Sequence, residues 1–303
     1  MPKRLINNAF KTLREQGFIY TSKKALQWIV DRRRILTYEP VKHLSPCHKD
    51  PKFEKGTNES RIAVQIHLFY TELIDTLIAY TNHIPYLFDL YISTNTLEKK
   101  KIIEREFAEK SQAHHIVVEV FENKGRDVAP FIMQMTPLIE KYDYLLHLHS
   151  KCSFHDDFGN QWRQLLLNSL LYSEGHVSAI MDQFEKNTRL GMVHQRTFYH
   201  VKPSLGWKGN KTLSIKYMQR MGLSDELPRN PIFPAGNMFW ARTDAIIQAF
   251  QCGICMQDFP AEAAQLDGTF AHCIERCWGH IAKQNGFESL RVAVPKGKKM
   301  ACK

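Results

Sequence analysis

The strongest chemical signal in the sequence is a pair of histidines at the end of a short apolar run. His147 and His149 alternate with leucines in the segment Tyr144–Lys151. Side chains two residues apart on a β-strand point to the same face, so both imidazoles and the Lys151 amine would share one face. That face could bind a metal ion, accept a proton or contact a phosphate, or it could hold an ordinary buried histidine pair. The lysine would repel a divalent cation, and the pattern therefore favours phosphate.

A second polar cluster follows another apolar run, where Glu122–Asp127 reads ENKGRD. Gly125 permits a positive φ angle or a close backbone approach. Arg126 carries a planar cation with five N–H donors, which suits a phosphate. Asp127 could cap the helix that follows, or accept hydrogen bonds from a sugar or a base. An ordinary turn with a capping aspartate and a surface arginine explains the same residues, and residue types alone leave both interpretations open.

Three further groups could contribute to a site. Trp162 and Arg163 stand at an expected helix start, where they could stack on a ring and hold a charge, or be a core tryptophan beside a surface arginine. The segment Phe233–Arg242 places aromatic side chains, a glycine and a cation close together. Asp267 opens the last long helix. An aspartate there usually caps the helix, but it can act as a general base when it faces a cleft.

Four of the seven cysteines have a spacing that resembles a zinc site. Cys252 and Cys255 are separated by two residues, and Cys273 and Cys277 lie one helical turn apart. The second pair lacks the usual two-residue spacing and falls inside an expected helix. Buried free thiols are therefore the interpretation that we favour over structural zinc.

The elements that must position these groups are strands alternating with helices. The expected strands are 62–69, 88–93, 116–121, 144–149, 190–194 and 239–241. The expected helices are 71–83, 96–110, a helix after Asp127, 158–171, 174–186 and 266–283, and 198–232 is expected to be a loop-rich insertion. This alternation predicts a doubly wound α/β fold with a parallel sheet. Ligands of such folds bind beyond the carboxyl ends of the strands, which brings His67 and Asn95 into the expected cleft.

Composition and charge limit the class of protein. The 303 residues are 44% hydrophobic and 24% charged, which is typical of a globular protein and excludes collagen-like, disordered and coiled-coil chains. No run approaches the length of a membrane-spanning helix, and the N-terminus lacks the apolar region of a secretory signal. We therefore expect a cytoplasmic protein without a disulfide framework.

The formal net charge of +10 is unevenly distributed. Residues 1–57 hold 13 Lys and Arg and 5 Asp and Glu, a net charge of +8, and apolar side chains recur there at helical spacing. A basic amphipathic helix fits an anionic membrane surface, and the alternative is a helix packed on the main domain. We expect a basic arm and linker over 1–58, a main domain over 59–290 and a basic tail over 291–303. The expected location is peripheral, on the inner face of the cytoplasmic membrane.

Several segments, in the right order over residues 61–282, resemble the rhamnan synthesis protein F family of bacterial polysaccharide biosynthesis proteins. They are HLFY at 67–70, FDLYIST at 88–94, ENKGRDVAPF at 122–131, YLLHLHSK at 144–151, WR at 162–163, FPAGNMFWAR at 233–242 and DGTFAH at 267–272. The resemblance implies a glycosyltransferase that moves rhamnose from dTDP-rhamnose to a growing capsule or lipopolysaccharide. It also implies a GT-A-like fold, a Rossmann-type mixed sheet flanked by helices.

The resemblance also implies roles for individual residues. Asp267 is the expected catalytic base, and a single carboxylate base predicts inversion at the anomeric carbon. The residues expected to bind the nucleotide-sugar donor are His67, Asn95, Asn123, Gly125, Arg126, Asp127, His147, His149, Lys151 and Arg163. The residues expected to bind the glycan or lipid-linked glycan acceptor are Trp162, Gly236, Asn237, Trp240 and Arg242, with Trp240 as a stacking platform for a sugar.

No cofactor is firmly expected. The GT-A-like fold would hold a divalent metal on an Asp-x-Asp motif at the position where this sequence has His147, His149 and Lys151. Metal ligands are therefore not expected, and side-chain cations are expected to neutralise the diphosphate instead.

Two other classes of function fit parts of the sequence. A metal-dependent hydrolase could use His147 and His149 as ligands with Asp267 as a partner, although Lys151 argues against it. A non-catalytic protein that binds anionic lipid or nucleic acid would explain the positive charge. The polar strand ends, however, lie in the nearly neutral main domain. We therefore expect an enzyme with no nucleic-acid partner.

Overall fold

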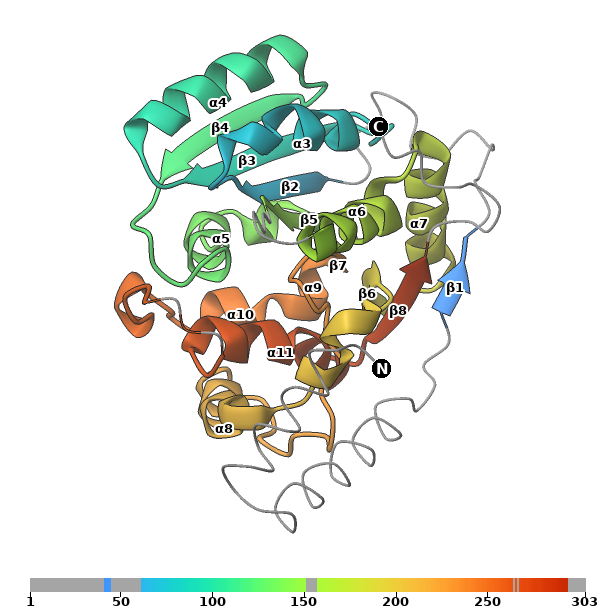
Figure 1. The fold of residues 1–303 in the computed structure, drawn as a ribbon. Coiled ribbons are helices and arrows are strands. Elements are labelled where there is room, and N and C mark those ends of the chain that lie inside the picture. Colours follow the sequence, from blue (N-terminus) through green and yellow to red (C-terminus); the bar gives the residue numbers. More distant parts are fainter. Residues whose placement is uncertain (1–40, 45–60, 151–156, 264, 266, 294–303) are drawn as a thin grey trace. The chain divides into compact units, whose positions relative to one another are not determined.

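The computed structural model describes residues 41–44, 61–150, 157–263, 265 and 267–293 (Figure 1). Within this part, residues 199–205 group apart from the rest and contain one 3₁₀ helix, Tyr199–Ser204. All elements described below belong to the other unit. Lys151 and the expected basic arm before residue 41 lie outside the described residues.

The described residues of the main unit form one mixed sheet, whose strands lie in the order β1-β8-β6-β7-β5-β2-β3-β4. The strands are β1 Val41–His43, β2 Ile62–His67, β3 Phe88–Thr94, β4 His115–Val120, β5 Tyr144–His149, β6 Leu190–Gln195, β7 Phe239–Arg242 and β8 Glu288–Ala293. Strand β7 is antiparallel to both neighbours, and every other pairing is parallel. The α/β fold class with a mixed sheet is thus confirmed, whereas a wholly parallel sheet is not.

Helices cover both faces of this sheet. They are α3 Ile74–Thr81, α4 Leu97–Lys110, α5 Val128–Met135, α6 Asp157–Leu171, α7 Glu174–Lys186, α8 Lys211–Arg220, α9 Thr243–Ile246, α10 Gln248–Gln251 and α11 Phe270–Gln284. Short 3₁₀ helices span Thr71–Leu73, Ile139–Lys141, Lys208–Asn210 and Met256–Asp258. Figure 1 shows α5, α10 and α11 close to one another, away from α3 and α4.

Alternating side chains along each strand build two separate hydrophobic cores. On β2, Val64 and Ile66 belong to the core shared with α3, α4, α6 and α7, whereas Ala63 belongs to the core shared with α5 and α8–α11. On β5, Leu146 likewise belongs to the first of these cores and Leu145 to the second. The central strands are buried on both faces for this reason, which is why their sequences read as continuous apolar runs.

Several local expectations can be compared with the structure. Thr96 caps α4, because its side chain accepts a hydrogen bond from Lys99 N across 3.3 Å. The insertion expected to be loop-rich contains α8, which the sequence reading missed. The sheet also extends past the expected limits of the main domain, since β1 lies within the expected linker and β8 runs past residue 290.

Candidate active site

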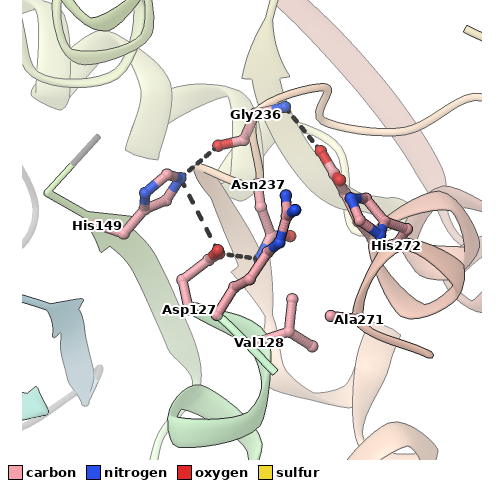
Figure 2. Close-up of a pocket in the computed structure, with 9 residues that line it drawn as sticks. Asp127, Val128, His149, Gly236, Asn237, Ala271 and His272 are labelled. Atoms are coloured by element: carbon pink, nitrogen blue, oxygen red, sulfur yellow. Dashed lines mark hydrogen bonds and ion pairs between the residues drawn. The ribbon is translucent and has the colours of Figure 1, made fainter. Parts of the chain in front are cut away.

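The carboxyl ends of the parallel strands meet at one edge of the sheet, and the candidate site lies there. His67 pairs in register with Ser93 of β3 on one side and with His149 of β5 on the other. Because β7 is antiparallel, the residues that precede it, Gly236 and Asn237, arrive at the same edge. Figure 2 shows the resulting pocket. It is lined by Arg126, Asp127, Val128, His149, Gly236, Asn237, Ala271, His272 and Glu275.

Asp127 is the centre of the polar network in this pocket. It precedes α5, but its side chain makes no capping hydrogen bond, so of the two interpretations left open by the sequence the helix cap is not the one observed. Instead, Asp127 Oδ2 accepts a hydrogen bond from Asn237 Nδ2 across 2.6 Å. The same oxygen lies 3.4 Å from His147 Nε2 and 3.9 Å from His149 Nε2. Burial alone would raise the pKa of the Asp127 carboxyl, but His149, His147 and Asn237 together hold this pKa well below its usual range.

A chain of buried amides fixes the proton position on His147. Gln134 Nε2 donates to the Ile92 carbonyl, so Gln134 Oε1 is left to accept from Gln65 Nε2 across 3.0 Å. Gln65 Oε1 is then the acceptor that faces His147 Nδ1 at 2.8 Å. An amide oxygen can only accept, and therefore His147 carries a proton on Nδ1.

The opposite side of the network surrounds the other nitrogen of His147. Trp278 Nε1 donates to Asn237 Oδ1 across 2.8 Å, which turns the Asn237 amino group toward Asp127 and toward His147 Nε2 at 3.2 Å. His147 Nε2 therefore faces both the Asn237 amino group and the Asp127 carboxylate. Burial lowers the pKa of His147, and the Asp127 carboxylate opposes this shift. Its ring stacks on Phe131, with the ring centroids 3.9 Å apart.

Exposure separates the two histidines that end β5. The His149 side chain keeps 10% of its surface exposed and lines the pocket, whereas the His147 side chain keeps none. A ligand in the pocket can therefore contact His149 directly, while His147 acts through Asp127 and Asn237. The sequence pattern predicted one shared face, and the structure adds that only one of the two histidines is accessible.

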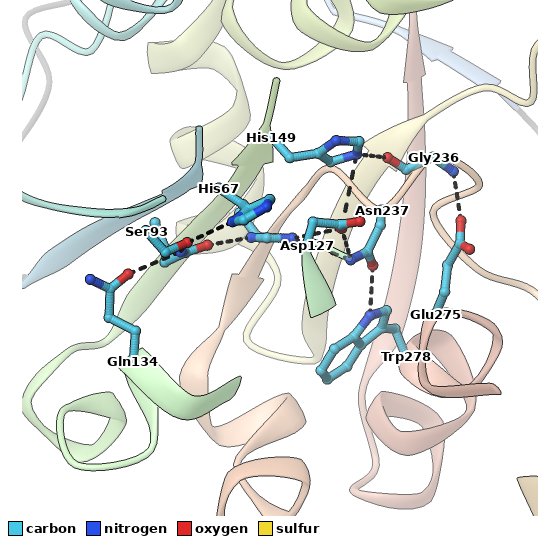
Figure 3. A network of polar contacts seen from close by, with 11 residues as sticks. His67, Ser93, Asp127, Gln134, His149, Gly236, Asn237, Glu275 and Trp278 are labelled. Carbon is cyan, nitrogen blue, oxygen red and sulfur yellow. Dashed lines mark hydrogen bonds and ion pairs between the residues drawn. The ribbon is translucent and has the colours of Figure 1, made fainter. Parts of the chain in front are cut away.

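Gly236 joins the two sides of the pocket through its backbone (Figure 3). Its carbonyl accepts from His149 Nε2 across 2.7 Å, and its N–H donates to Glu275 Oε1 across 2.8 Å. The residue has a φ of +99°, and a β-carbon there would lie 3.1 Å from Trp162 and Leu166. Glycine is required at this position for both reasons.

The loop before α5 supplies the cationic wall. Gly125 has a φ of +63°, and a β-carbon there would lie 2.5 Å from both Ala129 and the Phe259 ring. Arg126 also has a positive φ, 57°. Its backbone N–H donates to Glu262 Oε1 across 3.2 Å, and its guanidinium donates to the Gln265 carbonyl. The expected close turn and accessible arginine are both present here.

Some residues expected in the donor site do not line the pocket. His67 Nδ1 is 3.0 Å from Ser93 Oγ, and burial lowers the pKa of His67 to about 4. Asn95 Oδ1 accepts from Lys99 Nζ across 2.8 Å. Asn123 is exposed. Burial raises the pKa of Tyr80, and Arg163 lies close enough for its positive charge to offset part of this rise.

Two residues expected to bind the acceptor have structural roles instead. Trp240 is fully buried, and its indole N–H donates to the Leu170 carbonyl across 3.3 Å, so it cannot stack on a sugar. Arg242 lies at the far end of β7, where it donates to the Leu190 carbonyl and the Tyr144 hydroxyl, each across 3.0 Å. The expectation failed because a tryptophan on a central strand faces a core, and an arginine five residues after Asn237 has left the edge that carries the site.

Asp267 makes contacts of its own outside the pocket lining. Its carboxylate pairs with Arg276 at 3.0 Å and accepts from Asn210 Nδ2 across 2.9 Å. Partial burial opposes these contacts, yet Asn210 and Arg276 still lower the pKa of Asp267. Asp267 does not cap α11, because Thr269 holds that position and its hydroxyl lies 2.7 Å from His272 Nδ1.

Two lining residues, His272 and Glu275, were missed from the sequence. Both lie on the face of α11 that also presents Ala271 to the pocket, at spacings of one, three and four residues. Burial, reinforced by the nearby Arg126, lowers the pKa of His272 to about 4. The signal that could have found Glu275 is helical periodicity continued from His272.

The part of the chain that the structure describes contains neither a cluster of side chains suited to a metal ion nor a candidate membrane-spanning helix. No group of three or more His, Cys, Asp and Glu side chains among the described residues is arranged to hold a metal ion. The cysteines that suggested zinc are free thiols: Cys273 and Cys277 are buried, and Cys255 is exposed. Among the described residues, none of the helices combines the length and the apolar character that crossing a bilayer requires.

Comparisons with known proteins assign the chain to a protein family. The family model for rhamnan synthesis protein F matches residues 27–287. The "uncharacterized protein WxcX" of Xanthomonas campestris pv. campestris, in strains B100 and ATCC 33913, is 30% identical over 227 residues, which cover 74% of this chain. The chain spans only about a third of these relatives' length, 31%.

Solved structures gave weaker similarities. Glucosyl-3-phosphoglycerate synthase from Mycobacterium tuberculosis aligns at 11% identity with a TM-score of 0.35, over 80% of this chain and 74% of the synthase. The mannosyltransferase Ktr4p of S. cerevisiae aligns at 9% identity with a TM-score of 0.33, over 82% of this chain and 73% of Ktr4p. TM-scores this low carry no conclusion about function.

Proposed function

The chain belongs to the rhamnan synthesis protein F family, and we propose that it is a glycosyltransferase of polysaccharide synthesis. The observation that carries this proposal is the composition of the pocket. Its lining combines the Arg126 guanidinium and the His149 imidazole with the Glu275 carboxylate. Sugar transfer from a nucleotide donor needs both kinds of group, because a diphosphate leaves while an acceptor hydroxyl loses its proton.

The positions of these groups support a donor diphosphate on the cationic wall. Arg126 presents N–H donors that match phosphate oxygens, and His149 Nε2 carries the proton that it donates to Gly236. Asp127 Oδ2 lies 3.9 Å from His149 Nε2 and so holds the imidazole beside a carboxylate. The leaving diphosphate would then meet the Arg126 guanidinium and the His149 imidazole already in place, which is the arrangement that stabilises charge developing in a transition state.

We propose that donor binding does not depend on a divalent metal. The position at which a metal would be expected carries His147, His149 and Lys151, and the His147 side chain is inaccessible. The carboxylate nearest to these histidines, Asp127, is already hydrogen-bonded to Asn237. Side-chain cations are the groups that remain for neutralising the diphosphate.

The test is nucleotide release from a panel of nucleotide sugars, measured with and without EDTA. The panel includes dTDP-rhamnose, the donor that we propose, together with UDP- and GDP-linked hexoses and a glycan or lipid-linked glycan acceptor. Turnover that survives EDTA supports both proposals. Turnover that is lost on chelation and restored by manganese contradicts metal independence, and no turnover on any donor contradicts the transferase itself. Anomeric analysis of the product then tests inversion.

We also propose that the basic N-terminal segment binds the anionic inner surface of the cytoplasmic membrane. Residues 1–57 hold a net charge of +8, and each basic residue near an anionic surface contributes about 1 kcal/mol. Deleting residues 1–36 is expected to abolish binding to vesicles that contain phosphatidylserine at low salt. Full-length protein that ignores such vesicles would contradict this proposal.

A further inference from the structure

A histidine on the first turn of α11, His272, lines the pocket and keeps only 7% of its surface exposed (Figure 2). We infer that its neutral imidazole donates a hydrogen bond from Nε2 to a phosphate oxygen of the nucleotide-sugar donor. This inference rests on the proposed function. It adds a binding group on α11 to the one that the loop before α5 supplies.

The contacts with Thr269 determine which ring nitrogen of His272 carries the proton. The Thr269 backbone N–H donates to His272 Nδ1 across 3.4 Å, and the Thr269 hydroxyl lies 2.7 Å from the same nitrogen. A backbone N–H can only donate, so Nδ1 carries no proton. An imidazole without a proton on Nδ1 is neutral and carries its proton on Nε2. His272 is therefore a hydrogen-bond donor through Nε2, and it is not a cation.

The surroundings of the ring agree with a neutral imidazole. Burial is the largest effect and, with the nearby Arg126 guanidinium, lowers the pKa of His272 to about 4. The Asp267 and Asp127 carboxylates oppose this shift without reversing it. A charged ring would also turn an Nδ1 proton toward the Thr269 N–H, which would set two donors against each other.

The backbone of His272 is held in place as well as its ring. Arg276, one helical turn later on α11, donates to the His272 carbonyl across 3.0 Å. The same guanidinium is buried and pairs with the Asp267 carboxylate at 3.0 Å. Because Nδ1 is turned toward Thr269, Nε2 is the ring nitrogen that remains for a ligand in the pocket. A donor that is fixed before the ligand arrives loses little conformational entropy on binding.

Arg126 and His272 together favour a phosphate over a sugar hydroxyl. Both line the pocket, and a guanidinium and an Nε2–H group can donate hydrogen bonds but cannot accept them. Phosphate oxygens accept hydrogen bonds, whereas a hydroxyl group both donates and accepts. The first turn of α11, a helix of 15 residues, adds a positive partial charge at the same place. The carboxylates of the lining, Asp127 and Glu275, are acceptors and suit the hydroxyl groups of the transferred sugar instead.

The experiment measures the binding of dTDP and UDP to His272→Gln and His272→Met by calorimetry. Methionine is close to glutamine in length but has no hydrogen-bond donor. His272→Met should bind both nucleotides about 10- to 100-fold more weakly, as expected for the loss of a hydrogen bond to a charged group. Glutamine keeps an N–H donor and an oxygen that can accept from the Thr269 N–H, so His272→Gln should stay within about threefold of the wild type.

A buried histidine later on the same helix, His280, provides the matched control. His280→Met tests whether a general loss of stability in α11 weakens binding, and its affinity should match that of the wild type. Pyrophosphate should displace dTDP less effectively from His272→Met than from the wild type, because the lost contact is to phosphate. Unchanged displacement by pyrophosphate would overturn the inference, and so would weakened binding by His280→Met.

The remaining outcomes also decide. Equal affinities of His272→Gln and His272→Met overturn the inference, because the two side chains differ in the donor. If His272→Met does not fold, nitrogen NMR of the histidine-labelled wild type decides. An Nε2 proton whose resonance shifts on addition of dTDP supports the inference, and a proton on Nδ1 at neutral pH overturns it. A wild type that binds none of the nucleoside diphosphates contradicts the proposed function itself, whereas equally tight binding by the wild type and His272→Met overturns only the role of His272.

Discussion

Asp127 and Asn237 lie 110 residues apart in the sequence, yet Asn237 Nδ2 donates to Asp127 Oδ2 across 2.6 Å. One residue precedes α5 and the other precedes β7, so this hydrogen bond joins two loops that approach the site from opposite directions. It also connects the histidines that end β5 to Trp278 on α11. The contact therefore ties together three of the elements that surround the pocket.

Replacing Asp127 by Asn should destabilise the protein without affecting a helix cap. The variant exchanges a hydrogen bond to a charged group, which is worth about 1.5–3 kcal/mol, for a weaker one to a neutral amide oxygen, and it removes the negative charge beside the two histidines. Urea unfolding at pH 7 measures the loss. Thr96→Ala is the contrasting control, because Thr96 does cap α4 and its removal should cost about 1 kcal/mol with nucleotide binding unchanged. An unaltered unfolding free energy in Asp127→Asn would show that the network is not energetically important.

Two fully buried tryptophans allow a structural role to be compared with a role at the site. Trp278 and Trp240 are both fully buried, and each donates one indole hydrogen bond, to Asn237 Oδ1 and to the Leu170 carbonyl respectively. Replacing either by Phe leaves a buried acceptor without its donor, which should cost about 1–3 kcal/mol. Only Trp278→Phe should also lower the rate of sugar transfer, because it releases the Asn237 amide. Equal rates in both folded variants would contradict the positioning role of Trp278.

Substitution of Gly125 should be destabilising for two reasons, its positive φ angle and the lack of space for a β-carbon. A second glycine, Gly222, allows the two effects to be measured separately. Gly125 and Gly222 have similar positive φ angles of +63° and +69°, but a β-carbon meets nothing within 4 Å at Gly222. Gly222→Ala should therefore cost only the strain of the left-handed conformation, about 1–2 kcal/mol. Gly125→Ala adds the collision with Ala129 and Phe259, so it should be clearly less stable and should bind nucleotide more weakly. Equal melting temperatures for the two variants would contradict the steric argument.

Acid should destabilise the fold partly through His194. Burial, followed by the nearby Arg291, lowers the pKa of His194 to about 3, against 6.5 for the unperturbed side chain. Between these values the unfolded chain binds a proton that the folded chain excludes, so stability is lost as the pH falls below about 6.5. Near pH 5, unfolding of the His194→Phe variant should take up about one proton fewer than unfolding of the wild type. The slope of its unfolding free energy against pH should therefore be smaller by about 1.4 kcal/mol per pH unit. An unchanged slope would contradict the assignment.

The strands were predictable because each central strand is buried on both faces and reads as an apolar run. The polar contacts were not predictable. An aspartate such as Asp127 can cap its own helix or accept a hydrogen bond from a distant loop, and only the tertiary arrangement determines which of the two contacts forms. Trp240 and Trp278 show the same limit, since residue type does not say which tryptophan touches the site. Glu275 was within reach, because it lies three residues after His272 on an expected helix.

The direction of β7 has a consequence for how members of this family can diverge. Strand β6 ends and β7 begins at the edge of the sheet that carries the pocket, so the connection between them both leaves from and returns to that edge. Insertions, deletions or exchanges within this connection alter the chain beside the site while the strand register is preserved. Recombination of this connection alone could therefore change the chain beside the pocket without requiring related proteins to rebuild the loop before α5, which we propose binds the donor.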